Sequence, residues 1–245
     1  MERTAVYKLR RLFLALSFAL TMPAGGVVAP ASVQSVSAAG ALPECRYDDV
    51  LTQYLYRKDW QKTLVDTILM VPRSYTPPGR LVSTRKAGLN DQLARKFVIA
   101  DLAALGQAAR ENGTPLRITS GYRDFEEQER LYNREVKNLG LATGRLRVAR
   151  PGHSEHHLGT TFDMGSKVDR TAAWRFEDWA TTPTGAFLKD NAWRYGFVMS
   201  YPKDKQQITC YQYEPWHYRY LGRALAADVM ASGVTLREYL WQHFH

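Results

Sequence analysis

The most informative stretch of this 245-residue sequence is residues 151–163, which read PGHSEHHLGTTFD. Three histidines and a final aspartate stand among glycines, a composition too polar for routine packing in a protein core. Residues 160–164 alternate in the manner of a β-strand, so that Asp163 points away from Phe162 and Met164. We therefore predict a ligand-bearing loop that runs into a strand.

A second polar cluster lies at residues 213–219, which read YEPWHYR. It places a carboxylate, Glu214, three residues before an imidazole, His217, with aromatic side chains on both sides. Together the two clusters can supply two imidazole ligands, one carboxylate ligand and one carboxylate that stays free. A catalytic zinc site uses such a set, with three protein ligands, an open position for water and a general base nearby.

The residues alone leave the choice of metal ligands open. The candidate imidazoles are His153, His156, His157 and His217. Neighbouring His156 and His157 project to opposite sides of an extended chain, so we do not expect them to be joint ligands. Glu214 and His217 also diverge in a straight strand, because they are an odd number of residues apart. A bend at Pro215 would bring both to one metal ion.

Before these clusters, the spacing of apolar residues predicts two helices with a strand between them. Residues 90–111 form a helix whose apolar face is Leu93, Phe97, Ala100, Ala104 and Ala108. Residues 116–120 alternate like a short strand. The second helix starts at Asp124, has Glu127 in the capping-box position and ends at Gly140. Its expected buried stripe is Leu131, Tyr132, Val136 and Leu139.

The last third of the chain mixes strands with helices. Residues 195–201 and 208–213 are further strand candidates. Thr235 and Glu238 form a second capping box before a short helix through Trp241. Because strands and helices do not alternate regularly, we predict an α+β fold.

Successive motifs of this sequence closely resemble the VanY-type zinc D,D-carboxypeptidases of the LAS metallopeptidase superfamily. The motifs are SGYR at residues 120–123 with Gln128, PGHSEH at 151–156 continuing to Gly159 and Asp163, and EPWH at 214–217. The resemblance extends from about Trp60 to Gly222. It is specific because separated segments occur in the same order.

The resemblance implies a fold, a cofactor and a reaction. The fold would be α+β, with a small mixed or antiparallel sheet, flanking helices and a zinc site in a cleft over the sheet. His156, Asp163 and His217 would bind Zn²⁺. Glu214 would be the general base for hydrolysis of the terminal D-Ala-D-Ala bond of a peptidoglycan stem peptide. Arg123 would hold the developing oxyanion or a substrate carboxylate.

Other residues near the motifs are expected to surround the site. Gln128 and Ser154 would contact the substrate. His153 and His157 would line the cleft or orient a ligand by a hydrogen bond, and Trp216 would touch the active-site wall.

Three other functions are compatible with these residues. The same site could remove D-alanine from an L,D-linked tetrapeptide, or cut an L-Ala-D-Glu bond as an endopeptidase. A non-catalytic module that binds the cell wall is the third alternative. Glu214 argues against the module, because a binding protein has no need of a general base beside the metal.

The first 39 residues have the layout of a signal peptide. Arg10 and Arg11 precede an apolar run from Leu12 to Met22, and small residues predominate from Pro23 to Ala39. A membrane-spanning helix needs about 20 apolar residues, roughly twice this run. We therefore expect export to the periplasm, the cell wall or the medium, without stable membrane insertion after signal removal. An uncleaved N-terminal anchor is the alternative.

The mature chain is expected to have two parts. Residues 40–89 would be an N-terminal extension that wraps the core, and residues 90–245 the zinc peptidase domain. The two cysteines, Cys45 and Cys210, can pair in an oxidising compartment. A lipid-modified Cys45 is disfavoured, because Glu44 occupies a position where a lipoprotein signal has a small residue.

The charge of the chain is moderately positive. The formal charge of +9 comes from 33 Lys and Arg against 24 Asp and Glu. Residues 1–40 hold four of the basic residues and one of the acidic ones. The rest of the chain therefore has 29 basic and 23 acidic residues, a formal charge of +6. No run of Lys or Arg concentrates this excess. We expect no nucleic-acid partner, a weak attraction to anionic surfaces, and a monomer.

Overall fold

The computed structural model describes residues 40–245. The predicted signal peptide, residues 1–39, lies outside them. No helix among residues 40–245 combines the length and the apolar character needed to cross a membrane.

The main sheet has four antiparallel strands. They are β5 (Leu116–Ser120), β6 (Thr161–Ser166), β8 (His217–Tyr220) and β7 (Phe197–Met199), in this spatial order. Two smaller sheets pair β1 (Val50–Leu51) with β2 (Leu69–Met70) and β3 (Leu81–Ser83) with β4 (Leu93–Arg95). A small antiparallel sheet with helices around it confirms the predicted α+β class.

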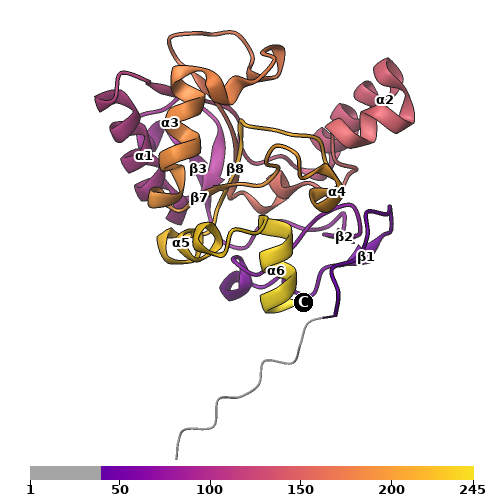
Figure 1. Ribbon diagram of the computed structural model, residues 1–245. Coiled ribbons are helices and arrows are strands. Elements are labelled where there is room, and N and C mark those ends of the chain that lie inside the picture. The colour runs from indigo at the N-terminus through magenta and orange to yellow at the C-terminus, as the bar shows by residue number, and fades with distance from the viewer. Residues whose placement is uncertain (1–39) are drawn as a thin grey trace, which may run out of the picture. The chain divides into compact units, whose positions relative to one another are not determined.

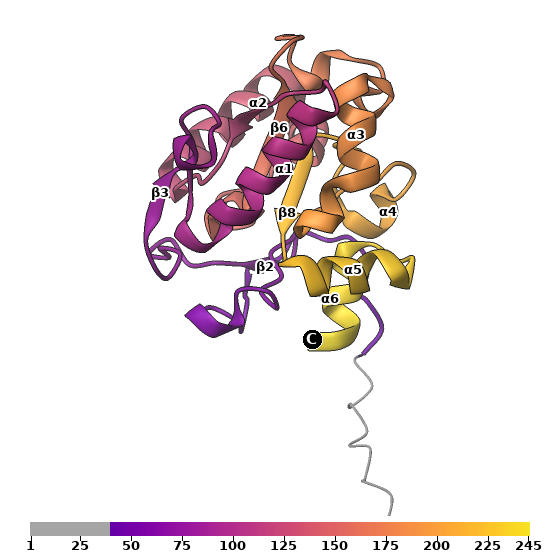
Figure 2. The ribbon, with the colours of Figure 1, turned by 90° about the vertical axis from the view of Figure 1, so that its left-hand side faces the viewer.

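Two helices cover one face of the main sheet. Figures 1 and 2 show α1 (Ile99–Glu111) and α3 (Pro183–Asn191) beside the strands. Alternate strand residues on this face join the helices in one apolar core, whose members include Leu102, Leu105, Ile118, Phe162, Met164, Leu188 and Tyr218. Because side chains alternate along a strand, their neighbours face the other way.

The opposite face of the sheet carries polar side chains. Asp163 in β6 is the register partner of His217 in β8, and Thr161 is the partner of Arg219. A loop with the short helix η4 (Glu155–Leu158) and the long helix α2 (Phe125–Arg147) lie at this face. The predicted alternation around Asp163 therefore places its carboxylate away from the apolar core.

The remaining helices come after the last strand of the main sheet in the chain or connect strands. The α-helices are α4 (Gln206–Thr209), α5 (Arg223–Ser232) and α6 (Leu236–Phe244). The other short 3₁₀ helices are η1 (Arg57–Asp59), η2 (Thr84–Ala87), η3 (Lys96–Val98), η5 (Ala173–Arg175), η6 (Trp179–Thr181) and η7 (Ala192–Tyr195). The predicted capping box of Thr235 and Glu238 is confirmed at the start of α6.

The predicted helix over residues 90–111 starts too early. The α-helix begins at Ile99, because residues 93–95 pair with β3 and residues 96–98 form a 3₁₀ turn. Leu93 and Phe97, which were expected on the buried face, are 44% and 42% exposed. The strand pairing, a contact between distant segments, overrides the local helical spacing.

The second predicted helix ends later than expected. Gly140 breaks the helical geometry with φ 78° and ψ 160°, yet helical turns resume and continue to Arg147. Asp124 caps the helix, because its carboxylate accepts from the Glu127 N–H at 2.7 Å, but the return bond from the Glu127 side chain that completes a capping box is not found among residues 40–245. The predicted stripe is only partly buried, and Leu139 is 38% exposed.

The predicted strand over residues 208–213 is wrong. Residues 206–209 form the short helix α4, which ends at Cys210 in the left-handed conformation with φ 67°. Residues 211–214 then form isolated backbone hydrogen bonds with neighbouring segments and no strand ladder. One example is the bond from Gln212 N–H to Leu146 O at 3.1 Å. Apolar alternation in so short a run does not distinguish a strand from an irregular buried segment.

Residues 40–89 pack against the segment that carries the histidines. The Val71 N–H donates to Gly152 O at 2.8 Å, and Arg150 donates to Thr67 O at 3.0 Å. A disulfide joins Cys45 to Cys210, with 5.3 Å between the Cα atoms. The boundary between an extension and a catalytic domain at residue 89 stays a prediction.

The disulfide is expected to contribute substantially to stability. It links residues 165 positions apart, so it restricts the unfolded chain strongly. A Cys45→Ala/Cys210→Ala variant should lose about 2–5 kcal/mol of unfolding free energy, measured by urea denaturation. Adding a reductant should lower the unfolding free energy of the wild-type protein to that of the variant. Equal stability of the oxidised protein and the variant would contradict this role.

Candidate metal centre

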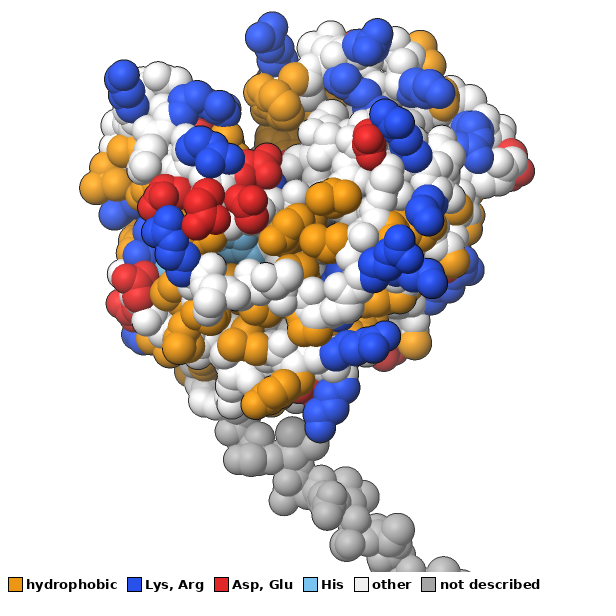
Figure 3. Space-filling view, turned by 180° about the vertical axis from the view of Figure 1, so that it is seen from behind, with side chains coloured by type: hydrophobic (Ala, Val, Ile, Leu, Met, Phe, Trp, Pro, Cys, Tyr) orange, Lys and Arg blue, Asp and Glu red, His pale blue; other side chains and the backbone are white. Residues whose placement is uncertain are grey.

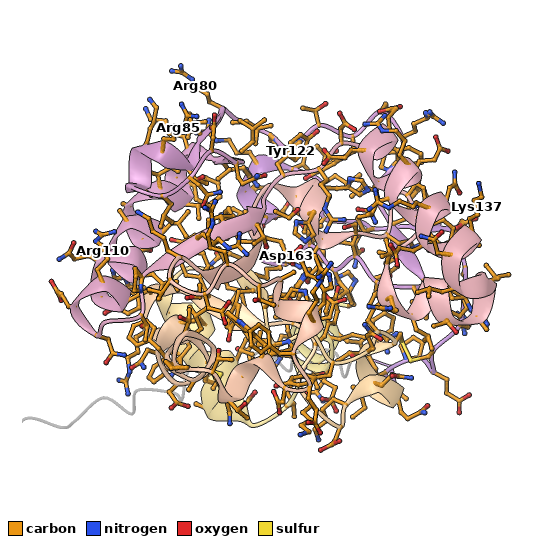
Figure 4. All side chains as sticks on the ribbon, turned by 90° about the horizontal axis from the view of Figure 1, so that it is seen from above. Arg80, Arg85, Arg110, Tyr122, Lys137 and Asp163 are labelled. Atoms are coloured by element: carbon orange, nitrogen blue, oxygen red, sulfur yellow. A yellow bond between two sulfur atoms is a disulfide. The ribbon has the colours of Figure 1, made fainter. Side chains whose placement is uncertain are left out.

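Three side chains from distant segments converge over the polar face of the sheet. His156, Asp163 and His217 each offer a ligand atom, and these atoms lie within 4.8 Å of one another. His156 Nε2 is 3.4 Å from Asp163 Oδ2, and His217 Nδ1 is 3.2 Å from Asp163 Oδ1. In Figure 4, Asp163 lies in the middle of the view, whereas Arg80, Arg110 and Lys137 project from its edges.

Hydrogen bonds fix the orientation of both imidazoles. His156 Nδ1 donates to the Gly121 carbonyl at 2.6 Å, so its hydrogen sits on Nδ1 and Nε2 faces the cluster. His217 Nε2 lies 3.1 Å from the carboxylate of Glu155, so Nδ1 faces the cluster. Such outer contacts with a carbonyl and a carboxylate are typical of metal-bound histidines.

The chemistry of these groups fits a zinc ion. His156 Nε2 and Asp163 Oδ1 are buried and have no hydrogen-bond partner within residues 40–245. Burial lowers the pKa of His156 to about 4, so its imidazole is neutral and keeps a lone pair at neutral pH. Two imidazoles and one carboxylate match the protein ligands of catalytic zinc sites, which leave a fourth position open.

A tight turn brings Glu214 beside His217. The His217 N–H donates to the Glu214 carbonyl at 3.1 Å, across a turn that contains Pro215 and Trp216. The predicted bend at Pro215 is therefore confirmed. Glu214 Oε2 lies 3.4 Å from His217 Nδ1. Burial raises the pKa of Glu214, which favours a carboxyl that can both take and return a proton.

Arg123 lies next to the three candidate metal ligands. Its Nη2 is 3.7 Å from Asp163 Oδ2, and its side chain is 11% exposed. The fully buried Gln128 accepts from Arg123 Nη1 at 2.7 Å and donates to Ala149 O at 2.7 Å. Gln128 therefore holds the guanidinium in place, in addition to lining the cavity.

These side chains line a cavity of about 440 Å³. Ser154 and Trp216 also line it; Ser154 caps η4 by accepting from the His156 N–H at 3.3 Å, and the ring of Trp216 packs edge-on against Trp174. Figure 3 shows this hollow from behind, with a histidine surface visible inside and acidic side chains gathered beside it. Its size is in the range of small-ligand sites.

The other two histidines of the loop have separate contacts. His157 donates from Nδ1 to the Arg123 carbonyl at 2.9 Å and accepts from the Gly152 N–H at 3.0 Å. It thus holds the backbone of Arg123. His153 differs from the expectation of a place in the cleft: it is buried against residues 40–89, with Nδ1 2.7 Å from Asp66 O and Nε2 3.0 Å from Asp49 Oδ1.

Sequence reasoning missed the group that orients His217. Glu155 is 3% exposed and also accepts from Ser200 Oγ at 2.6 Å and from Arg219 Nη1 at 3.1 Å. Arg219, fully buried, donates onward to Thr63 O at 2.6 Å. Interactions with His217, Arg219 and Ser200 outweigh the effect of burial and lower the pKa of Glu155 to about 2. The one feature of the sequence that could have indicated this role of Glu155 is its position directly before His156.

Comparison with known proteins identifies the family. The family model for VanY, described as D-alanyl-D-alanine carboxypeptidase, matches residues 91–223. The chain belongs to the VanY family. This match includes the three converging residues, Glu214 and Arg123, and it confirms the resemblance of the motifs.

Curated relatives of this chain extend the comparison. YodJ of Bacillus subtilis is 32% identical over 180 residues, which cover 72% of this chain and 65% of YodJ. A D-alanyl-D-alanine carboxypeptidase of Enterococcus faecium is 33% identical over 152 residues, covering 62% of this chain and 44% of that enzyme. The chain thus aligns with less than two thirds of either relative.

Solved structures share the fold of this VanY-family chain. A mutant of the vancomycin resistance D,D-pentapeptidase VanY, in complex with Zn(II), is 30% identical with a TM-score of 0.63, over 74% of this chain and 99% of that one. The LD-carboxypeptidase LdcB is 31% identical with a TM-score of 0.60, over 73% of this chain and 85% of that one. Carboxypeptidases with two specificities therefore share this architecture.

Proposed function

We propose that the protein is an exported zinc carboxypeptidase that removes the terminal D-alanine from peptidoglycan stem peptides. The observation that carries this proposal is the convergence of His156, Asp163 and His217 with Glu214 beside them. Membership of the VanY family and the Zn(II) complex of a similar structure support it. The proposed partner is the stem peptide; the monomeric state stays a prediction.

The metal would be held by His156 Nε2, His217 Nδ1 and the carboxylate of Asp163. Zinc in such a site supplies Lewis-acid chemistry, lowering the pKa of water to about 7 and polarising the peptide carbonyl. Glu214 takes the proton of the attacking water and returns it to the leaving D-alanine amine. The raised pKa of Glu214, caused by burial, suits both steps.

Arg123 supplies a fixed positive charge at the same site. A guanidinium cannot lose its proton at working pH, so it can hold the oxyanion or the terminal carboxylate of the substrate. Gln128 and the backbone contact from His157 keep it in position. Ser154, on the cavity wall, is the proposed hydroxyl contact to the peptide.

L,D-carboxypeptidase activity is the second candidate. It is favoured by the LdcB structure, whose identity and TM-score are close to those of the VanY structure. The two activities act on different stems: a D,D-enzyme shortens a pentapeptide, and an L,D-enzyme shortens a tetrapeptide. The leaving group is D-alanine in both reactions, so the substrates differ only on the other side of the cleaved bond.

Defined muropeptides separate these activities. The zinc-loaded protein is incubated with pentapeptide and tetrapeptide stems, and the products are read by mass spectrometry. We expect loss of one D-alanine from the pentapeptide. An intact pentapeptide together with a shortened tetrapeptide would replace the proposal by L,D-specificity, and cleavage between L-Ala and D-Glu would replace it by endopeptidase activity.

Glu155→Gln is expected to weaken zinc binding. The substitution keeps the size of the side chain but removes the negative charge from the partner of His217 Nε2. Changes to such outer partners lower metal affinity roughly 10–100-fold. Competition with a fluorescent chelator gives the Kd, and Glu111→Gln on the exposed end of α1 is the control. An unchanged Kd would show that Glu155 only supports the fold.

A further inference from the structure

A second cavity, of about 480 Å³, lies behind the catalytic segment. Residues 211–214 run between the two cavities: Tyr211, Gln212 and Glu214 line the first, and Tyr213 lines the second. The second cavity is as large as the candidate active site and falls within the size range of small-molecule sites. Nothing in the proposed reaction uses it.

The walls of this second cavity are mainly apolar. It is lined by the edge strand β7, by α3 and by the turn from α5 to α6. The apolar lining includes Leu188, Trp193, Phe197, Met199, Val229 and Leu236. Met230, at the lip, is 47% exposed. An apolar body would be taken out of water here, which favours binding.

One polar group in this lining lacks a partner. Tyr218 is 2% exposed, and its hydroxyl is buried without a hydrogen bond to any of residues 40–245. Buried hydroxyls in proteins are nearly always hydrogen-bonded, because desolvation without a partner is unfavourable. The nearby Tyr213 hydroxyl is already used, since it donates to Asp178 Oδ1 at 2.9 Å. A ligand oxygen would satisfy Tyr218.

The rim of the cavity is positively charged. Lys189, Lys203 and Lys205 line it, and all three are exposed. Lys203 is paired with Asp178 at 3.2 Å, whereas Lys189 and Lys205 form no ion pair with the part of the chain that the structure describes. Asp178 is the only acidic residue in the lining. The site therefore favours a ligand that carries a negative charge.

We propose that this second cavity is a binding site for an amphiphilic carboxylate. The apolar body would lie against β7, α3 and the α5–α6 turn, and the carboxylate would reach Lys189, Lys205 and the hydroxyl of Tyr218. A neutral apolar ligand would leave the lysines and the hydroxyl unused. A strongly polar anion would leave the apolar walls exposed to water.

Titration calorimetry with decanoate tests this proposal without any turnover. We expect saturable binding near one molecule per chain, and at least tenfold weaker binding of decanol. A Lys189→Glu/Lys205→Glu variant should bind decanoate at least tenfold more weakly. The matched control is Lys58→Glu/Lys137→Glu, which reverses two exposed lysines outside the cavity lining and should leave the affinity unchanged.

Tyr218→Phe checks the polar contact in the apolar wall. The variant removes a hydroxyl that has no partner, so the fold should keep its stability while decanoate binding weakens several-fold. No saturable binding to the wild-type protein, or equal affinities for all lysine variants, would overturn the proposal. Because D-alanine release is not measured, failure here leaves the carboxypeptidase proposal untouched.

Discussion

Glu214→Gln is expected to lower kcat for D-alanine release by roughly 10²–10⁴-fold, the range of a lost general base. An amide of the same shape cannot take the proton of the attacking water. The bound metal should stay near one ion per chain, because the three ligand atoms belong to other side chains. Release of D-alanine and metal content are measured on the same preparation.

The geometry makes this an informative substitution. Glu214 is 8% exposed, and its Oε2 lies 3.4 Å from a nitrogen of His217. The amide keeps the volume, so a packing defect is not expected to mimic the loss of the base. Glu177→Gln, on an exposed residue, is the control. Full activity of Glu214→Gln would reject the mechanism, and a zinc-loaded wild-type protein inactive on all stems would support a binding module.

The sequence predicted the parts of the site that depend on local geometry. Strand alternation placed Asp163 opposite to Phe162, and the register of β6 with β8 then sets it beside His217. The bend at Pro215 followed from the odd spacing of Glu214 and His217. The choice of His156 over its neighbours came from the resemblance to the VanY family, because spacing alone left several imidazoles open.

Contacts between distant segments could not be predicted in this way. The first turns expected of α1 are a strand, because residues 93–95 pair with residues 81–83. Glu155 meets Arg219 across 64 positions of sequence. His153 is drawn toward Asp49 and Asp66 by the folding of residues 40–89 against the loop. The spacing of residues within one segment does not predict these contacts. The family motif therefore identifies the metal ligands but not the residues that orient them.

Asp163→Ala is expected to abolish stoichiometric zinc binding and D-alanine release together. Two imidazoles would remain, one fewer than the three protein ligands of catalytic zinc sites. The change also removes the negative charge closest to Arg123, whose Nη2 is 3.7 Å from Asp163 Oδ2. The positive charge of Arg123 would then lie beside the metal position without its nearest counter-charge, which weakens zinc binding further.

Metal analysis after dialysis and a chelation cycle measures this loss. Wild-type protein stripped by a chelator should lose activity and regain it when zinc is added, whereas Asp163→Ala should not respond to zinc. Asp169→Ala, an exposed aspartate beyond the end of β6, is the control and should behave like the wild-type protein. A folded Asp163→Ala variant that still binds one zinc ion per chain would show that Asp163 is not a metal ligand, because the loss of a ligand weakens zinc binding.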